Sequence, residues 1–140
     1  MDNFEIFKKF LDENKFDYKQ EVLETGERFF RVSEKLKNDQ VVNAVIIFSA
    51  QSIKIILFGI AQIEGEEKQI ACLKLFNRFA RQYSFFKFYL RENGDVHVET
   101  DVIAGVFAGE FRPRILMAYV NAGADLVQEV YEDIIKIQNS

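Results

Sequence analysis

The chain has no tryptophan and is poor in proline, cysteine, histidine and methionine. Its 140 residues include one Cys, one His, one Pro and two Met. A lone cysteine, Cys72, forms no disulfide within the chain, which is typical of proteins from a reducing compartment. With His97 as its only histidine, the sequence lacks the clustered ligands of a zinc site. We therefore expect no metal and no cofactor.

Long hydrophobic runs are also missing. The longest apolar stretches, residues 44–48 and 53–63, are shorter than the roughly 18 apolar residues that a membrane span needs. The N-terminal segment MDNFEIFKKFLDEN carries charges throughout, unlike a secretory signal peptide. A net charge of −4 disfavours nucleic acid or an anionic membrane as the main partner. We expect a soluble, cytoplasmic protein that binds neither.

Aromatic residues, by contrast, are abundant. The chain has 15 Phe and 5 Tyr, and 49% of its residues are hydrophobic. This is enough apolar material for a substantial core, and the length fits one domain over residues 1–140.

The most informative stretch is residues 66–100, where the hydrophobic period changes from that of a helix to that of a strand. Residues 66–83 repeat apolar side chains every three or four positions, and this predicts a helix. Residues 85–91 then alternate as a strand, and Asn93-Gly94 marks a turn before a return strand. The expected buried face of the helix consists of Ile70, Leu73, Phe76, Phe79, Ala80 and Tyr83.

The length of this hairpin turn follows from which side chains would meet across it. A two-residue loop would pair Phe88 with Glu99 and bury charge among aromatic rings. A three-residue loop, with Gly94 in the left-handed conformation of a bulge, instead pairs Leu90 with Val96 and Phe88 with Val98. It also sets polar residues opposite each other on the second face. We predict the three-residue loop.

The rest of the chain supplies two further helices and four further strands. An Asp2 cap predicts a first helix to about residue 14, and Pro113 opens a last one that runs to about residue 137. Strands are expected at residues 16–22, 28–34, 41–48 and 51–63, the last two being central because they are the most apolar. Gly59 suggests a bulge or a close backbone approach, and Gly123 a close helix crossing.

These elements predict an α+β fold, with helices on one face of a single antiparallel sheet. The expected order is αβββαββα, with an extra short N-terminal strand if the hairpin formed by residues 16–34 counts as two strands.

The order of elements and three local motifs resemble the YbjN-like family, which shares the fold of type III secretion chaperones. The motifs are Leu75-Phe76-Asn77, the strand Phe86-Lys87-Phe88-Tyr89-Leu90 and the turn Asn93-Gly94-Asp95-Val96. The resemblance implies a homodimeric, non-enzymatic bacterial protein that holds a partner chain or takes part in regulation, as a sensory transduction regulator would. It implies no catalytic residue.

The candidate binding surface lies on the predicted hairpin and the loop that follows it. Alternation places Tyr89 on the face away from Phe88, where exposed apolar side chains mark protein interfaces. Glu99 and Asp101 could bind a hard cation, but residues of this kind are more often solvated strand positions, here paired with Lys87. The expected partner-binding residues are Phe85, Lys87, Tyr89, His97, Val106 and Phe107.

Two hypotheses of function follow. The first is an interaction protein, chaperone-like or regulatory, that binds an unknown polypeptide as a homodimer. The alternative is a small-ligand binder with a pocket between helices and sheet, opened by Gly59 and residues 102–109.

Overall fold

A computed structural model of the chain describes residues 1–103 and 111–140. The elements, in chain order, are α1 (Asn3–Glu13), β1 (Lys19–Val22), β2 (Arg28–Lys35), β3 (Val41–Phe48), β4 (Ser52–Phe58), α2 (Glu66–Gln82), β5 (Lys87–Leu90), β6 (Val96–Ile103) and α3 (Pro113–Gln138). The predicted order is confirmed, and β1 is the extra N-terminal strand.

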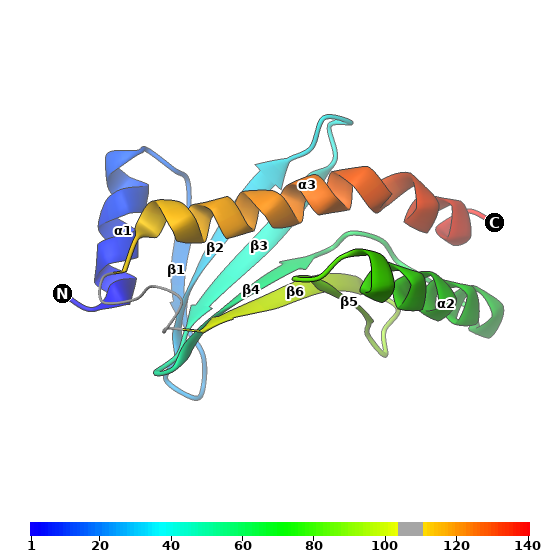
Figure 1. The fold of residues 1–140 in the computed structure, drawn as a ribbon, viewed down its shortest axis with the longest axis horizontal. Coiled ribbons are helices and arrows are strands. Elements are labelled where there is room, and N and C mark those ends of the chain that lie inside the picture. The colour runs from blue at the N-terminus through cyan, green and yellow to red at the C-terminus, as the bar shows by residue number, and fades with distance from the viewer. Residues whose placement is uncertain (104–110) are drawn as a thin grey trace.

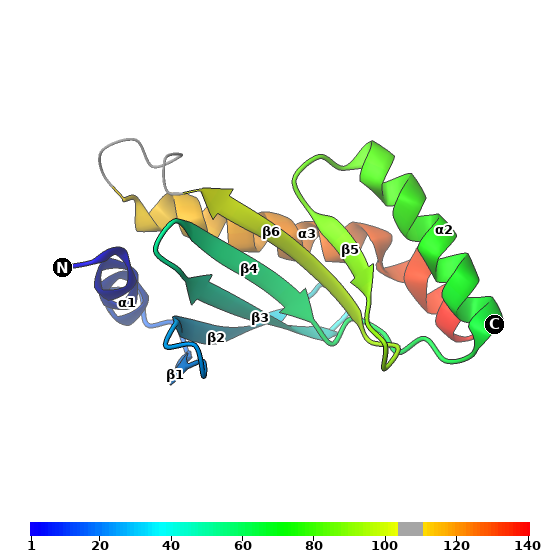
Figure 2. The ribbon, with the colours of Figure 1, turned by 90° about the horizontal axis from the view of Figure 1, so that it is seen from below.

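The strands form one open six-stranded sheet in the order β1-β2-β3-β4-β6-β5, and all neighbours are antiparallel. The two most apolar strands, β3 and β4, are central, as predicted. The helices cover one face, which we call the inner face, so the predicted fold class is confirmed (Figure 1). Seen from below, the strands lie in front of α3, and none of the helices in residues 1–103 and 111–140 lies over this outer face (Figure 2).

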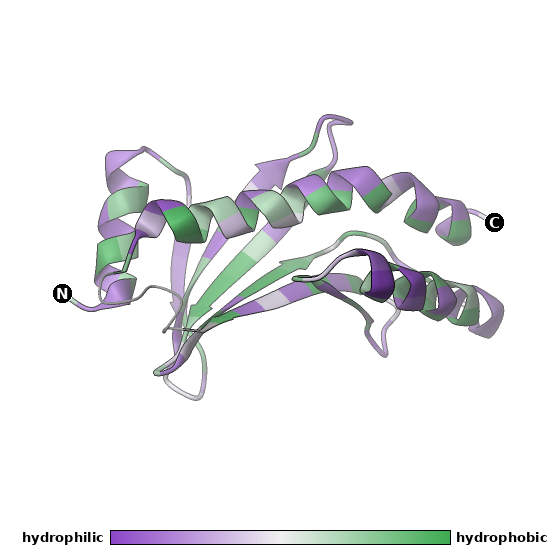
Figure 3. Cartoon of the chain, in the orientation of Figure 1, coloured by the Kyte–Doolittle hydropathy of each residue, from purple (hydrophilic) through white to green (hydrophobic). Residues whose placement is uncertain are grey.

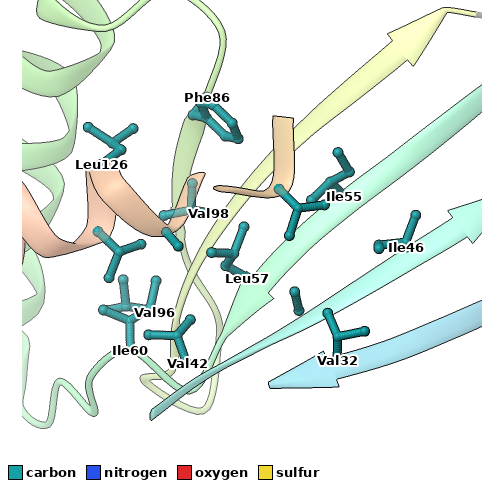
Figure 4. Packing of buried hydrophobic residues seen from close by; sticks show 14 of the residues in the cluster. Val32, Val42, Ile46, Ile55, Leu57, Ile60, Phe86, Val96, Val98 and Leu126 are labelled. Atoms are coloured by element: carbon teal, nitrogen blue, oxygen red, sulfur yellow. The ribbon is translucent and has the colours of Figure 1, made fainter. Parts of the chain in front are cut away.

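The core lies between the inner face and the helices. Inner-face side chains follow the strand period of two, so that Ile46, Ile55 and Leu57 are each fully buried. Residues of α3 and of the segment before β5, such as Leu126 and Phe86, close over them (Figure 4). The most hydrophobic colouring accordingly falls on the central strands and on the side of α3 that meets them (Figure 3).

The first helix begins where the sequence predicts. The side chain of Asp2 accepts a hydrogen bond from the Glu5 N–H at 2.9 Å, as an N-cap does. The guanidinium of Arg28 on β2 also pairs with Asp2 and with Glu5, and it lies 4.3 Å from the centre of the Phe4 ring. These contacts fix α1 against the end of the sheet.

The buried face of α2 differs from the prediction. Ile70 and Leu73 are 47% and 53% exposed, and Ala80 is exposed too. The buried positions are Cys72, Leu75, Phe76 and Phe79. The helix carries two overlapping apolar stripes at helical spacing, and the sequence alone does not tell which one meets the sheet. Cys72 is thus a core residue.

Strands β4 and β6 also end differently from expectation. β4 stops at Phe58 because Gly59 takes a positive φ of 72°, and a Cβ atom there would have open space around it. The glycine is thus required by backbone conformation, and a close approach is the wrong explanation. β6 extends to Ile103, so Val102, which was expected in the loop of residues 102–109, is an inner-face strand residue and only 3% exposed.

Candidate functional site

The hairpin formed by β5 and β6 has the predicted register. Leu90 pairs with Val96, Phe88 with Val98 and Tyr89 with His97. Gly94 has a φ of 87°, and the Arg91 N–H donates to the Asp95 carbonyl at 2.9 Å. The three-residue loop is therefore confirmed. Its consequence is that Lys87, Tyr89 and His97 share the outer face.

The structure brings together only part of the predicted binding surface. Lys87 and Tyr89 lie side by side on β5 with His97 opposite Tyr89, and Tyr89 is 42% exposed. Phe85 is 69% exposed, but it precedes the strand. Val106 and Phe107 lie outside the described residues.

Phe85 borders a groove on the helix side of the molecule. The groove lies between the end of α2 and the middle of α3, and its apolar lining includes Tyr83, Phe86 and Leu126. Two acidic side chains, Asp125 and Glu129, stand at its rim. Partial burial and the nearby Glu129 carboxylate raise the pKa of Tyr83, so its phenol stays neutral. The groove is an apolar surface edged with negative charge.

The pair Tyr89 and His97 is held by polar neighbours. The Nε2 atom of His97 lies 2.7 Å from Oδ2 of Asp95, and the His97 ring is 6.0 Å from the ring of Phe58. Partial burial raises the pKa of Tyr89, and the neighbouring Glu99 carboxylate raises it further. Tyr89 is therefore a neutral hydrogen-bond donor on an exposed aromatic ring, which suits contact with another protein.

The carboxylates of β6 form ion pairs with a lysine. The Nζ atom of Lys54 is 3.9 Å from a carboxylate oxygen of Glu99 and 3.9 Å from one of Asp101. Lys87 stands opposite Glu99 in register, as predicted, but the ion pairs come from Lys54. Across residues 1–103 and 111–140, no three His, Cys, Asp or Glu side chains gather as metal ligands would.

Cys72 has the surroundings of a structural thiol. It is fully buried on α2, and burial raises its pKa to about 11. The nucleophilic thiolate is thus scarce at neutral pH.

The predicted pocket between helices and sheet is occupied by side chains, which form one continuous buried cluster there (Figure 4). A shallow cleft does lie beside Gly59, where β4 ends near α3. Its glutamines bond within the protein, since Gln138 accepts from the Gln62 N–H at 2.7 Å and Gln40 accepts from the Tyr131 hydroxyl at 3.2 Å. Residues 104–110, which form most of the loop expected to open the pocket, lie outside the described residues.

Sequence reasoning missed a second apolar surface, on the outer face. We call it the outer patch; it consists of Phe29, Val45, Ile47, Ile56 and Phe58 on β2, β3 and β4. None of these side chains belongs to the core cluster or packs against it. The signal was present, because β3 and β4 are apolar at both odd and even positions. Such strands need cover on both faces, but the helices cover one.

Comparison with known proteins identifies the family. A family model described as "putative bacterial sensory transduction regulator", the YbjN family, matches residues 3–136. A search of curated proteins finds no match. Within the described part of the chain, no helix is both long and apolar enough to cross a membrane. Since this match runs from the first residue of α1 to two residues before the end of α3, the chain belongs to the YbjN family.

Proposed function

We propose that the protein is a non-enzymatic regulator that acts by binding another polypeptide, and that it does so as a homodimer. The observation that carries the proposal is the exposure of large aromatic side chains at the β5 edge of the sheet. Phe85 is 69% exposed beside an apolar groove, and Tyr89 is 42% exposed on the neighbouring strand. Exposed aromatic residues of this size are enriched at protein interfaces and dominate their binding energy.

The chemistry of the surface supports the same proposal. The groove beside Phe85 pairs an apolar lining with acidic Asp125 and Glu129. A polypeptide with an apolar anchor next to a lysine or arginine fits this combination. The family description, a sensory transduction regulator, agrees with a regulatory role.

The test is recovery of the partner and comparison of matched surface variants. Tagged protein purified from its own cells carries the partner, whose identity is read by mass spectrometry, and calorimetry with the purified pair then gives the affinity. We expect Phe85→Ala and Tyr89→Ala each to weaken binding at least tenfold. Ile115→Ala, which truncates a side chain 37% exposed on α3, is the control and leaves binding unchanged.

Equal affinities of Phe85→Ala, Tyr89→Ala and Ile115→Ala for the partner would contradict the proposal. So would a purified protein that carries a small molecule and no polypeptide.

A further inference from the structure

Three carboxylates follow one another on α3 beside the groove at Phe85. Asp125, Glu129 and Asp133 are spaced four residues apart, so neighbours in this row stand about 6 Å apart along the helix. Asp125 and Glu129 line the groove. Asp133 lies near Tyr83, another lining residue, since the pKa of that phenol is raised by burial, then by Glu129 and then by Asp133. We call these three carboxylates the acidic row.

The acidic row takes part in no ion pair within residues 1–103 and 111–140. The ion pairs found there involve other carboxylates, such as those of Asp2, Glu21 and Asp101. All three side chains of the row are exposed to solvent. Carboxylates four residues apart on a helix repel one another. A positively charged partner would relieve this repulsion, whereas an acidic or phosphorylated partner would increase it.

The floor of the groove is apolar. Phe86 and Leu126 form part of it and are buried, and Ala122 of α3 also lines it. The ring of Phe85 stands at the edge of the groove and is 69% exposed. An apolar side chain of a partner can pack between this ring and the floor, and anchors of this kind dominate the binding energy of protein interfaces.

We propose that the groove beside Phe85 binds a basic amphipathic helix of a partner protein, which sets an apolar side chain against Phe85 and Leu126 and lysine or arginine side chains along the acidic row. Basic residues four positions apart on such a helix also stand about 6 Å apart, which matches the spacing of the row. The inference rests on the polypeptide partner of the proposed function and names the chemistry of that partner.

A helix suits this groove better than an extended strand. One wall is α3, whose backbone groups along this stretch are hydrogen-bonded within the helix and offer nothing to a strand. On the other wall, the Tyr83 N–H already donates to the Phe79 carbonyl at 2.8 Å. A strand would therefore leave backbone groups unpaired over an apolar floor, whereas a helix pairs its own. Amphipathic helices seated in apolar grooves are a recurring mode of peptide recognition.

The experiment titrates the whole chain with two synthetic peptides by isothermal titration calorimetry. Both are amphipathic helices about 18 residues, or five turns, long, with leucines on one face. One carries lysines on the other face and the second carries glutamates at the same positions. We expect the lysine peptide to bind at least a hundredfold more tightly than the glutamate peptide. Added salt should weaken its binding, because exposed charge pairs are screened.

Variants of the chain test whether the groove is the site. Asp125→Lys combined with Glu129→Lys should weaken binding of the lysine peptide at least tenfold and strengthen binding of the glutamate peptide. Phe85→Ala should weaken binding of the lysine peptide at least tenfold without any change of charge. The matched control is Glu24→Lys combined with Glu92→Lys, which alters the net charge equally at two exposed turn residues away from the groove and leaves the affinity unchanged. Circular dichroism establishes that each variant is folded.

Three results would overturn the inference. They are equal affinity for the two peptides, binding of neither peptide, and equal weakening by the groove variant and the control, which would show that net charge alone attracts the peptide.

The natural partner separates this inference from the proposed function. If the partner purified from cells is lost with Phe85→Ala but retained by the double lysine variant at Asp125 and Glu129, the proposed function stands and the inference fails. A dimer of the chain that dissociates in the double lysine variant would also overturn it. The occupant would then be α2 of a second copy, which exposes Leu73 beside Lys74.

Discussion

A Cβ atom at position 123 would lie 2.9 Å from Cδ1 of Leu57, so Gly123 is the point at which α3 touches the centre of the sheet. The ring of Phe86 is equally close, 3.1 Å from the same position. The glycine lies on the buried stripe of the helix, where a side chain would force Leu57, Phe86 or α3 itself to shift.

Gly123→Val is therefore expected to lower the free energy of unfolding by about 1 to 3 kcal/mol, the usual cost of overpacking a core. Asn121→Val is the control, since it places the same β-branched side chain at an exposed position of the same helix. Its effect should stay within about 0.5 kcal/mol. Urea unfolding measures both variants. Equal effects would show that the contact between α3 and the sheet can accommodate a side chain at position 123.

Much of this fold follows from local sequence. The hairpin register was predictable because only one loop length keeps charged residues such as Glu99 out of the aromatic face. Asp2 and Pro113 marked helix starts because capping and proline geometry act within one turn. The close approach of α3 at Gly123 could be predicted because a glycine on an apolar stripe indicates a close helix crossing.

What sequence did not predict depends on long-range packing. The apolar stripe of α2 that faces inward, with Cys72 and Leu75, is chosen by contact with other elements, and the competing stripe of Ile70 and Leu73 has the same spacing. Phe85 lines a groove with residues of α3 because helix placement, which alternation does not encode, brings them together. The apolar residues of β3 and β4 at both odd and even positions indicate that both faces of the sheet need cover, but they do not tell which face the helices leave uncovered.

A second stability prediction concerns Gly94, the turn glycine of the β5–β6 hairpin. A Cβ atom at position 94 would collide with the carbonyl oxygen of Ile63 and lie 2.8 Å from Nε2 of Gln62. Gly26 has a similar φ, 91° against 87°, but open space around it. Gly26→Ala should thus cost only the conformational penalty, about 1 to 2 kcal/mol.

Gly94→Ala should cost clearly more, because backbone atoms have to move as well. The difference between the two variants in chemical denaturation isolates the clash. If Gly94→Ala were no more destabilising than Gly26→Ala, the segment before α2 would be able to shift away from the turn at little cost.

The two faces of β5 give a third prediction. Phe88 points inward, with its ring centre 4.9 Å from that of Phe79 and 5.5 Å from that of Phe76. Phe88→Ala is expected to lower the free energy of unfolding by about 3 kcal/mol. Tyr89→Ala removes an outer-face side chain and one cross-strand pair, which should cost about 1 kcal/mol or less. Similar losses of unfolding free energy from both variants would mean that Tyr89 also packs against other parts of the protein.

A partly buried carboxylate gives a prediction about pH. Glu34 of β2 is partly buried, and this burial, together with the nearby Asp125 carboxylate, raises its pKa above the usual value of 4.5. A raised pKa means that the folded state holds the proton more tightly than the unfolded state, so ionisation of Glu34 at higher pH destabilises the fold.

Glu34→Gln should therefore increase the free energy of unfolding at pH 7, and the gain should vanish below about pH 4, where the carboxyl is protonated in both states. Asp125→Asn should give part of the same gain in stability, because it removes the neighbouring negative charge that raises the pKa of Glu34. Thermal unfolding across the pH range measures both variants. A gain that is the same at pH 7 and pH 3.5 would show that Glu34 acts through packing and not through its charge.

Substitutions of Asp2 can distinguish the stability that comes from capping α1 from the stability that comes from the ion pair with β2. Asp2 caps α1 and pairs with Arg28, and the Glu5 N–H and then Arg28 hold the pKa of its carboxyl below the usual 3.8. Asp2→Ala removes both functions and should cost about 1 kcal/mol or somewhat more, whereas Asp2→Asn keeps a capping oxygen and should cost less.

A lowered pKa of Asp2 means that the ionised carboxylate stabilises the folded state at pH values above the unfolded-state pKa. This contribution is lost as the pH falls through the folded-state pKa. The difference between Asp2→Asn and the wild type should therefore be constant from pH 5 to pH 7 and should shrink below about pH 4, as measured by thermal unfolding. A difference that persists unchanged at pH 2.5 would mean that the ion pair with Arg28 adds nothing, and that the cap alone holds the start of α1.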